Sequence, residues 1–494
     1  MNYSDIPRSL FERAQRKENG GELTVGRGGG YFADAMGRFA KNRAAITAAV
    51  LILLVVLFSL FAPIILKSSS PSALDAYYAK KPPRYTLGGG TKQDYTKRGI
   101  IAALAIGAGA SGQNGEVIPF SEIDEKYNPI KGDIRENGNT YTARTDHYLE
   151  VGFIYMQIDG EELDKIRAFE RESGRSVLYP LIAQNEFCAD YSNANYWYKT
   201  DRRLDPIDDR GEKIPYSDTM VLSENYMRGE DGTAVYAVYS GGGENAEYRV
   251  RVLYYNYYIY KNGFEPSYLL GTDAQGYDLA LRLADGVRLS LGIALGVSVI
   301  NLLLGSAYGA ISGYYGGRTD TLMQRITEIL SGIPFIVVAT LFQIHLAKRV
   351  GAVPSLLFAF VLTGWISTAE RVRAQFYRFK NQEYVLAART LGASDARIIL
   401  RHIFPNALGT LITSSVLIIP SVIFSESMLS FLGIVNLGGA DVTSLGALLS
   451  EASGIWTSYP HLMLFPAAVI SVLMISFNLF GNGLRDAFDP SAED

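Results

Sequence analysis

The sequence predicts an all-α polytopic membrane protein of six transmembrane helices, with a folded α+β domain inserted outside the membrane. Two observations lead to this prediction. Apolar residues are concentrated in blocks long enough for a helix to cross a hydrocarbon core, which takes roughly 20 residues. Between the first and second block lies a long polar stretch, residues 67–270, which holds 23 of the 32 tyrosines.

The first apolar block runs from Ala44 to Leu66 and contains no charged residue. Some forty mostly polar residues precede it, with Arg38 and Lys41 close to its start. A cleaved signal peptide would lie at the extreme N-terminus and end in a small-residue cleavage site. Neither feature is present, so the block is interpreted as a signal-anchor helix.

Five more apolar blocks follow in the C-terminal half. They cover residues 286–313, 324–348, 352–370, 407–433 and 461–484. Backbone groups in lipid need partners within the chain, which leaves helices and closed barrels as spanning structures. The blocks lack the alternation of barrel strands, so they are predicted to be helices.

Orientation follows from the positive-inside rule. The first 43 residues carry eight Lys or Arg residues, and residues 371–401 carry seven. An even number of spans places both segments, the 314–323 turn and the C-terminus in the cytoplasm. It places residues 67–270 outside.

The outside segment has a mildly acidic composition, with 24 Lys or Arg residues against 30 Asp or Glu residues. Strands are predicted for His147–Ile158, Thr233–Ser240 and Glu247–Tyr260, and a helix for Glu161–Ser173. The last two strands flank a glycine-rich hairpin turn. The tyrosines of Tyr254–Tyr260 fit an alternating strand better than a docking surface, which is the alternative.

A basic stretch between the fourth and fifth spans has the pattern helix, break, helix. Gly392 interrupts the helical pattern, Ser394 can cap the next short helix, and Pro405 suits the start of the following span. Paired alanines at 387 and 388 leave a thin surface that another protein's backbone can approach. Taken alone, the stretch is also compatible with an ordinary basic loop.

The sequence from Glu383 to Ser394, followed by Arg401–Asn406, resembles the EAA loop, the cytoplasmic coupling element of bacterial binding-protein-dependent ABC importer permeases. A second stretch, Leu270–Asp278 followed by Arg282, resembles the signature that precedes the second span of C-type subunits in the oligopeptide/dipeptide/nickel family. Further matches are Phe39–Leu66, Ser430–Gly433, Ser444–Gly446 and Gly483–Asp486. The resemblance covers residues 32–66 and 266–490, but not the insert.

The resemblance implies a type I ABC importer fold and a permease in the bacterial inner membrane, with no enzymatic activity of its own. It divides the chain into a cytoplasmic segment (1–43), a first transmembrane helix (44–66), an extracytoplasmic insert (67–265) and a permease core (266–490) with the EAA loop at 383–405. The expected ATPase-coupling residues are Glu383, Ala387, Ala388, Arg389, Gly392 and Ser394. The outer-face family motif comprises Gly271, Thr272, Asp273, Gly276, Asp278 and Arg282.

The implied partners are a related second permease, two ABC ATPase subunits, an extracytoplasmic solute-binding protein and membrane lipid, without nucleic acid. ATP and Mg²⁺ belong to the ATPases, because Gly88–Lys92 lacks the spacing of a phosphate-binding loop. No catalytic residue, metal or cofactor is expected on this chain, which has one cysteine and four scattered histidines. Peptides are the expected cargo. Nickel or another small solute, a membrane-anchored receptor and an exporter are the alternatives.

Polar residues within the apolar blocks are candidates for the transport pathway. An ionisable residue in lipid is costly, so Glu426 is expected to face a cavity or to bond another helix, with neither favoured. Asn301 and Gln343 are weaker candidates, and bonding between helices is the favoured explanation for both.

Overall fold

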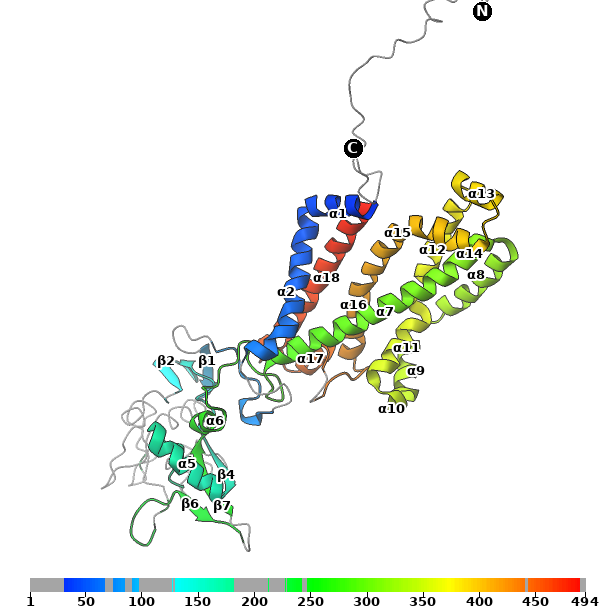
Figure 1. The fold of residues 1–494 in the computed structure, drawn as a ribbon. Helices are drawn as coiled ribbons and strands as arrows, with labels where there is room; N and C mark the ends of the chain where they lie inside the picture. Colours follow the sequence, from blue (N-terminus) through cyan, green and yellow to red (C-terminus); the bar gives the residue numbers. More distant parts are fainter. Residues whose placement is uncertain are drawn as a thin grey trace, which may run out of the picture.

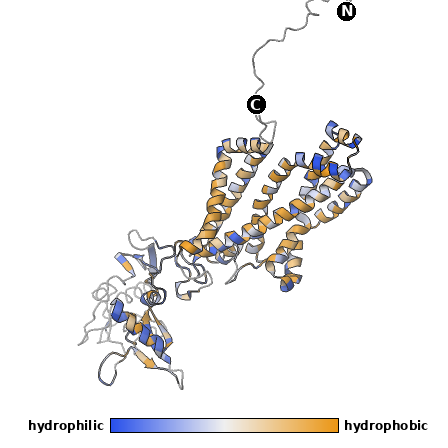
Figure 2. Ribbon diagram, in the orientation of Figure 1, coloured by the Kyte–Doolittle hydropathy of each residue, from blue (hydrophilic) through white to orange (hydrophobic). Residues whose placement is uncertain are grey.

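The computed structural model describes residues 31–66, 74–84, 91–96, 127, 129–181, 212, 227, 229–241, 247–439 and 443–488. A bundle of long helices occupies one part of the molecule, and small β-sheets with two short helices form a separate part at one end of it (Figure 1). Hydrophobic residues dominate the bundle, whereas the smaller part is mixed in hydropathy (Figure 2).

The bundle consists of helices that follow one another along the chain, and short breaks divide several of them into shorter helices. Its helices are α1 (Tyr31–Lys41), α2 (Arg43–Ile65), α7 (Leu279–Tyr315), α8 (Gly317–Ser331), α9 (Phe335–His345), α10 (Ala347–Val350), α11 (Ala352–Gly364), α12 (Ile366–Phe379), α13 (Glu383–Thr390), α14 (Asp395–Arg397), a π-helical segment (Ile398–Ile403), α15 (Phe404–Val416), α16 (Ile418–Phe431), α17 (Leu445–Ala452) and α18 (Pro460–Phe488).

Five helical segments of the described chain are long and apolar enough to cross a membrane, and a bent pair gives up to six. The five are Arg43–Ile65, Leu279–Tyr315, Ala352–Phe379, Asp395–Phe431 and Pro460–Phe488. The predicted continuous span 324–348 is wrong in detail. It is divided between α8 and α9, which are bent by 72° at a short break. Pro334 explains the break, because proline has no backbone N–H and disfavours a helical conformation of the residue before it.

Close packing of α7 against α12 depends on a row of glycines. Gly305, Gly309 and Gly313 recur every four residues and therefore lie on one face of α7. A Cβ atom on Gly313 would lie 2.7 Å from Cβ of Phe376 on α12, and one on Gly309 would clash with the backbone of Ala369. Small residues let transmembrane helices approach in this way, where lipid offers little hydrophobic force for association.

The smaller part contains two antiparallel sheets. The first has strand order β1–β3–β2, with β1 (Thr91–Thr96), β2 (Ile130–Asn137) and β3 (Thr140–Thr145). In the second, β7 (Glu247–Leu253) pairs with β4 (Phe153–Asp159), β5 (Leu178–Tyr179) and β6 (Ala237–Tyr239). The predicted hairpin turn at 241–245 lies almost wholly outside the described residues.

Helix α5 (Gly160–Ser173) confirms the predicted helix at Glu161–Ser173. Asp159 caps it, accepting a bond of 2.7 Å from the backbone N–H of Glu162, and Gly174 ends it in a left-handed conformation. Its apolar residues Leu163 and Ile166 are buried in the core that includes the strands of the second sheet.

The predicted strands are only partly correct. Residues 147–151 form turns, so the first strand begins at Phe153 instead of His147, and the second is limited to Ala237–Tyr239. The third strand ends at Leu253, and the chain continues as helix α6 (Tyr254–Asn262). Its tyrosine rings pack around Tyr78, which lies 5.1 Å from Tyr254 and 5.4 Å from Tyr258 between ring centroids. This packing outweighs the strand preference of tyrosine.

Candidate functional site

The loop between α12 and α15 (residues 383–405, the coupling loop) has a defined helix ending. Gly392 adopts a φ of +85°. The N–H of Ala393 donates to the carbonyl of Ala388 at 3.0 Å, and that of Gly392 donates to the carbonyl of Arg389 at 3.0 Å. These two bonds constitute a Schellman motif, which glycine permits because it has no Cβ atom. Ser394 occupies the N-cap position of α14, without a capping bond from its side chain.

One face of the coupling loop is anchored and the other is exposed. Val385 and Ile398 are fully buried in a cluster that includes Phe376 and Leu411. Leu391 is 88 % exposed and Leu400 is 68 % exposed. Glu383, Ala387, Arg389 and Gly392 are also exposed, and Ala388 is half-buried. Apolar side chains so exposed on a rigid support are typical of a protein-binding surface.

Polar contacts connect this surface to the end of α7, and further contacts beside it connect α8 to α12. Tyr314 at the end of α7 donates a bond of 2.6 Å to Asp395, and Arg389 donates one of 3.2 Å to Tyr314. Nearby, Arg373 of α12 holds Asp320 of α8 through two bonds of 2.5 and 2.6 Å. The coupling loop is thus bonded directly to the end of α7, and α8 is bonded to α12.

At the other end of α7, residues 270–282 (the outer junction) form a tight turn. The Oδ1 atom of Asp273 accepts backbone N–H bonds from Gln275, Gly276 and Tyr277 at 2.8–2.9 Å. Asp278 caps α7 by accepting a bond of 2.8 Å from Ala280. The carboxylates at 273 and 278 thus determine where the turn closes and where α7 begins.

The outer junction also holds the chain that leaves α2. Thr272 donates to the carbonyl of Tyr78, and its hydroxyl accepts a bond of 2.8 Å from the N–H of Lys81. Gly271 and Gly276 have φ values of +82° and +101°, and a Cβ atom on either would clash with the backbone of residues 75–83. Glycine is therefore required by both backbone conformation and space.

Arg282 completes the outer junction from within. Its side chain is 1 % exposed, and its guanidinium lies 3.4 Å from Asp273 and donates a bond of 2.6 Å to the carbonyl of Gly439. Burial raises the pKa of Asp273, and that of Glu451, 4.0 Å from Arg282, is also raised by burial. All six predicted motif residues thus lie together in the outer junction, where their contacts stabilise the turn and the start of α7.

A cavity of about 730 Å³ lies among the helices of the bundle. Asn301 of α7 is one of its walls, together with Phe335, Phe360 and residues of α12 and α18. Its longest wall is formed by α15 and α16, which contribute Thr410, Thr413, Ser414, Ser421 and Ser425. The cavity is thus rich in hydroxyl groups.

Comparison with known proteins identifies the family. Residues 276–494 match the model of the binding-protein-dependent transport system inner membrane component, and residues 30–83 match the N-terminal transmembrane domain of oligopeptide transport permease C. The oligopeptide transport system permease protein OppC of Bacillus subtilis is 42 % identical over 221 residues, which cover 44 % of this chain and 70 % of the relative. The chain belongs to this family of transport permeases.

Other relatives agree with this assignment of the permease. The dipeptide transport system permease protein DppC of Lactococcus lactis subsp. cremoris is 40 % identical, over 46 % of this chain and 65 % of the relative. The OppC protein of Haemophilus influenzae is 42 % identical, over 46 % of this chain and 71 % of the relative. The resemblance predicted from the coupling loop and the outer junction is confirmed, as is the helical, multi-pass class of the permease.

Two of the predicted pathway residues of the permease lie away from the cavity wall. Glu426 is fully buried, and its carboxyl group accepts bonds from Ser290 of α7 at 2.8 Å and from Ser430 at 3.1 Å. Gln343 donates a bond of 3.0 Å to the carbonyl of Ala352, which joins α9 to α11. Both contacts are of the helix-bonding kind, and a role in transport stays a prediction for either residue.

The hydroxyl wall of the cavity was missed by the sequence reasoning, although a signal was present. Thr410, Ser414, Ser421 and Ser425 are separated by four, seven and four residues. This spacing places them on one face of a helix. Ionisable and amide side chains stand out within apolar blocks, whereas the periodicity of these hydroxyl groups does not.

Proposed function

We propose that the protein is a permease subunit of an ATP-driven importer that translocates oligopeptides or dipeptides delivered by an extracytoplasmic binding protein. The observation that carries this proposal is the coupling loop, an exposed helix with a rigid glycine ending within a chain of this family. The names of the relatives, oligopeptide and dipeptide permeases, support peptide cargo over nickel. A receptor with a single anchor would leave the cavity and the coupling loop without a role.

In this proposal the coupling loop binds a cleft on a separate ATPase. Leu391 and Leu400 supply apolar contact area, Glu383 and Arg389 supply charge, and Ala387 permits close approach of the ATPase surface. Gly392 and Ser394 shape the break between α13 and α14. When ATP binding moves the ATPases, the bonds of Tyr314 and the Asp320–Arg373 pair transmit the displacement to α7, α8 and α12.

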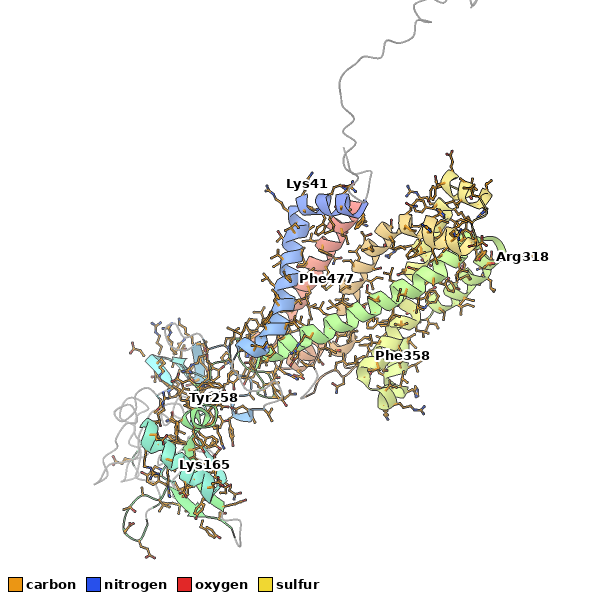
Figure 3. The ribbon with its side chains drawn as sticks, in the orientation of Figure 1. Lys41, Lys165, Tyr258, Arg318, Phe358 and Phe477 are labelled. Atoms are coloured by element: carbon orange, nitrogen blue, oxygen red, sulfur yellow. The ribbon has the colours of Figure 1, made fainter. Side chains whose placement is uncertain are left out.

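The proposed membrane orientation has six spans, with the bent pair of α8 and α9 as one of them. Lys41 and Arg318 lie at the same end of the bundle, far from Lys165 and Tyr258 at the opposite end (Figure 3). Basic residues at one end support a cytoplasmic location for residues 1–43, the coupling loop and the C-terminus. The segment 67–265 then forms an α+β insert outside the membrane, and residues 266–490 form the permease core.

The proposed complex contains a related second permease, two ATPases that hold ATP and Mg²⁺, and a solute-binding protein. ATP hydrolysis in a reconstituted complex tests the coupling role. A Glu383→Ala, Gly392→Arg double variant should assemble normally and lose hydrolysis stimulated by the binding protein. A Glu328→Ala variant removes a carboxylate from a surface ion pair of α8 and is the matched control. Normal stimulation in the assembled double variant would refute the coupling role.

The insert is proposed to dock or orient the solute-binding protein. Its support is the connection to the outer junction, where Thr272 donates to the carbonyl of Tyr78, and the backbone N–H of Lys80 donates to the carbonyl of Asp273 at 2.8 Å. Within the insert, Arg84 continues this connection by donating to Asp146 at 2.9 Å and to Tyr255 at 3.0 Å. These contacts hold the insert beside the outer end of α7. A chain in which a short linker replaces residues 85–262 should bind the solute-binding protein more weakly. Unchanged affinity and unchanged transport would contradict docking.

A further inference from the structure

The cavity has two features that its place in the family does not explain. The first is the hydroxyl face of α15 and α16. From Thr410 to Ser425 this face extends over about 22 Å at a helical rise of ~1.5 Å per residue. Ser414 donates a bond of 2.7 Å to the carbonyl of Thr410 on the same helix, so its oxygen keeps lone pairs directed away from the backbone. Such a wall can exchange hydrogen bonds with the amide groups of any peptide.

The second feature is the charge of the cavity. Among the described residues that line it, the charged ones are Arg371 of α12 and Arg485 of α18. Both are exposed. Arg371 follows Ser367 by one helical turn, and Arg485 lies near the end of α18, at the end of the bundle where the coupling loop lies (Figure 1). The cationic groups are therefore concentrated at the inner end of the hydroxyl wall.

The positive-inside rule alone accounts for arginines at this end of the bundle, but not for their position on the wall of a polar cavity. A guanidinium group binds a carboxylate through two parallel N–H bonds. Every unmodified peptide carries one carboxylate at its C-terminus, whatever its side chains. Hydroxyl groups for the backbone and guanidinium groups for the terminus together match the features that all peptides share.

We propose that Arg371 and Arg485 form a carboxylate-selective site at the inner end of the translocation cavity, which favours passage of peptides with a free C-terminus. The proposal rests on the proposed function, because it names a specificity of the same pathway. Exposed charge pairs are individually weak. The two arginines together should therefore favour the acid over the corresponding amide by roughly two- to thirtyfold in uptake rate.

The test uses the complete transporter in proteoliposomes, with trialanine and trialanine amide as cargoes. The affinity of the binding protein for each cargo is measured separately, and both cargoes are used at saturating concentration, so that the permease alone determines the ratio of uptake rates. The variants are Arg371→Gln, Arg485→Gln and the double variant. Arg371→Lys with Arg485→Lys keeps the charges, and Arg325→Gln on α8 removes an exposed arginine outside the cavity wall.

We expect the double glutamine variant to lose the roughly two- to thirtyfold preference through slower uptake of the acid, with uptake of the amide unchanged. The lysine variants and Arg325→Gln should keep the preference. An unchanged preference in the double glutamine variant would overturn the proposal, and so would an equal loss of both uptakes. A wild-type complex that takes up neither peptide would instead refute the peptide-import function itself.

Discussion

The replacement of Arg282 by methionine tests the outer junction most sharply. The side chain is 1 % exposed and lies 3.4 Å from Asp273. Removing one partner of a buried ion pair costs roughly 3–5 kcal/mol, because the other charge stays buried without compensation. Asp273 keeps three backbone N–H bonds in the variant, so the lower end of this range, about 3 kcal/mol, is expected.

A loss of this size should lower the apparent melting temperature of the permease core (residues 266–490) by roughly 6–12 °C, at about 2–4 °C per kcal/mol for a folding unit of that size. An Asp273→Asn, Arg282→Met double variant removes the stranded charge and keeps the Oδ1 acceptor of the turn. It should recover at least part of the loss. The assay is thermal unfolding of each variant in the same detergent.

The pH dependence gives an independent check. Burial raises the pKa of Asp273 above its ordinary value of 3.8, and Arg282 opposes this rise. In the window between 3.8 and the raised pKa, the folded state binds more protons than the unfolded state, so stability falls as pH increases through it. Without Arg282 the pKa rises further, and the deficit of Arg282→Met should shrink as pH is lowered.

The Asp273→Asn, Arg282→Met variant should lack the part of the pH dependence that comes from residue 273. Glu451 is present in this variant and in Arg282→Met, so its contribution is common to both. A melting temperature within 1 °C of wild type for Arg282→Met, or a deficit that is independent of pH, would refute the assignment of Arg282 as the buried partner of Asp273.

Three further predictions follow from the packing of the core and of the coupling loop. Gly309→Leu should prevent the close contact of α7 with α12 and greatly reduce the yield of folded permease. Gly292→Leu, at an open position on the same helix, should be tolerated. Equal yields of the two variants would contradict the close packing at Gly309. Asp320→Asn and Arg373→Met should show a coupling energy of about 1–2 kcal/mol in a double-mutant cycle of thermal stability. Additive effects would show that the two side chains do not stabilise each other. Gly392→Val should lower stimulated ATP hydrolysis in an assembled complex, because the left-handed backbone at this position costs a valine about 1–2 kcal/mol. Gly392→Asn should lower the hydrolysis less, since asparagine tolerates this conformation better. The reverse order would contradict the role of the turn.

Elements determined by local chemistry were predictable from the sequence. Helix α5 has a capping aspartate at 159, a buried pair at Leu163 and Ile166, and a glycine ending, and its prediction is accurate to one residue. The break at Gly392 is likewise a local property of glycine. The long apolar segments are recognised because lipid leaves few backbone structures available.

Elements determined by distant contacts were not predictable. Tyr254–Tyr260 has the composition of a strand and forms a helix, because its rings pack around Tyr78, which lies far away in the sequence. Besides the nearby Asp273, Arg282 contacts Gly439 and Glu451, and no local pattern reveals these two distant contacts. The bend between α8 and α9 is an intermediate case. Pro334 was visible in the sequence, but a hydropathy window does not register it.

Uptake of a labelled peptide tests the central claim most directly. The complete complex is reconstituted into proteoliposomes with ATP on the side of the ATPases and with the binding protein loaded with trialanine on the other side. We expect the peptide to accumulate only when both ATP and the binding protein are present, and this accumulation to be lost in the Glu383→Ala, Gly392→Arg variant. A complex that hydrolyses ATP and binds the loaded binding protein, yet accumulates no peptide, would contradict it.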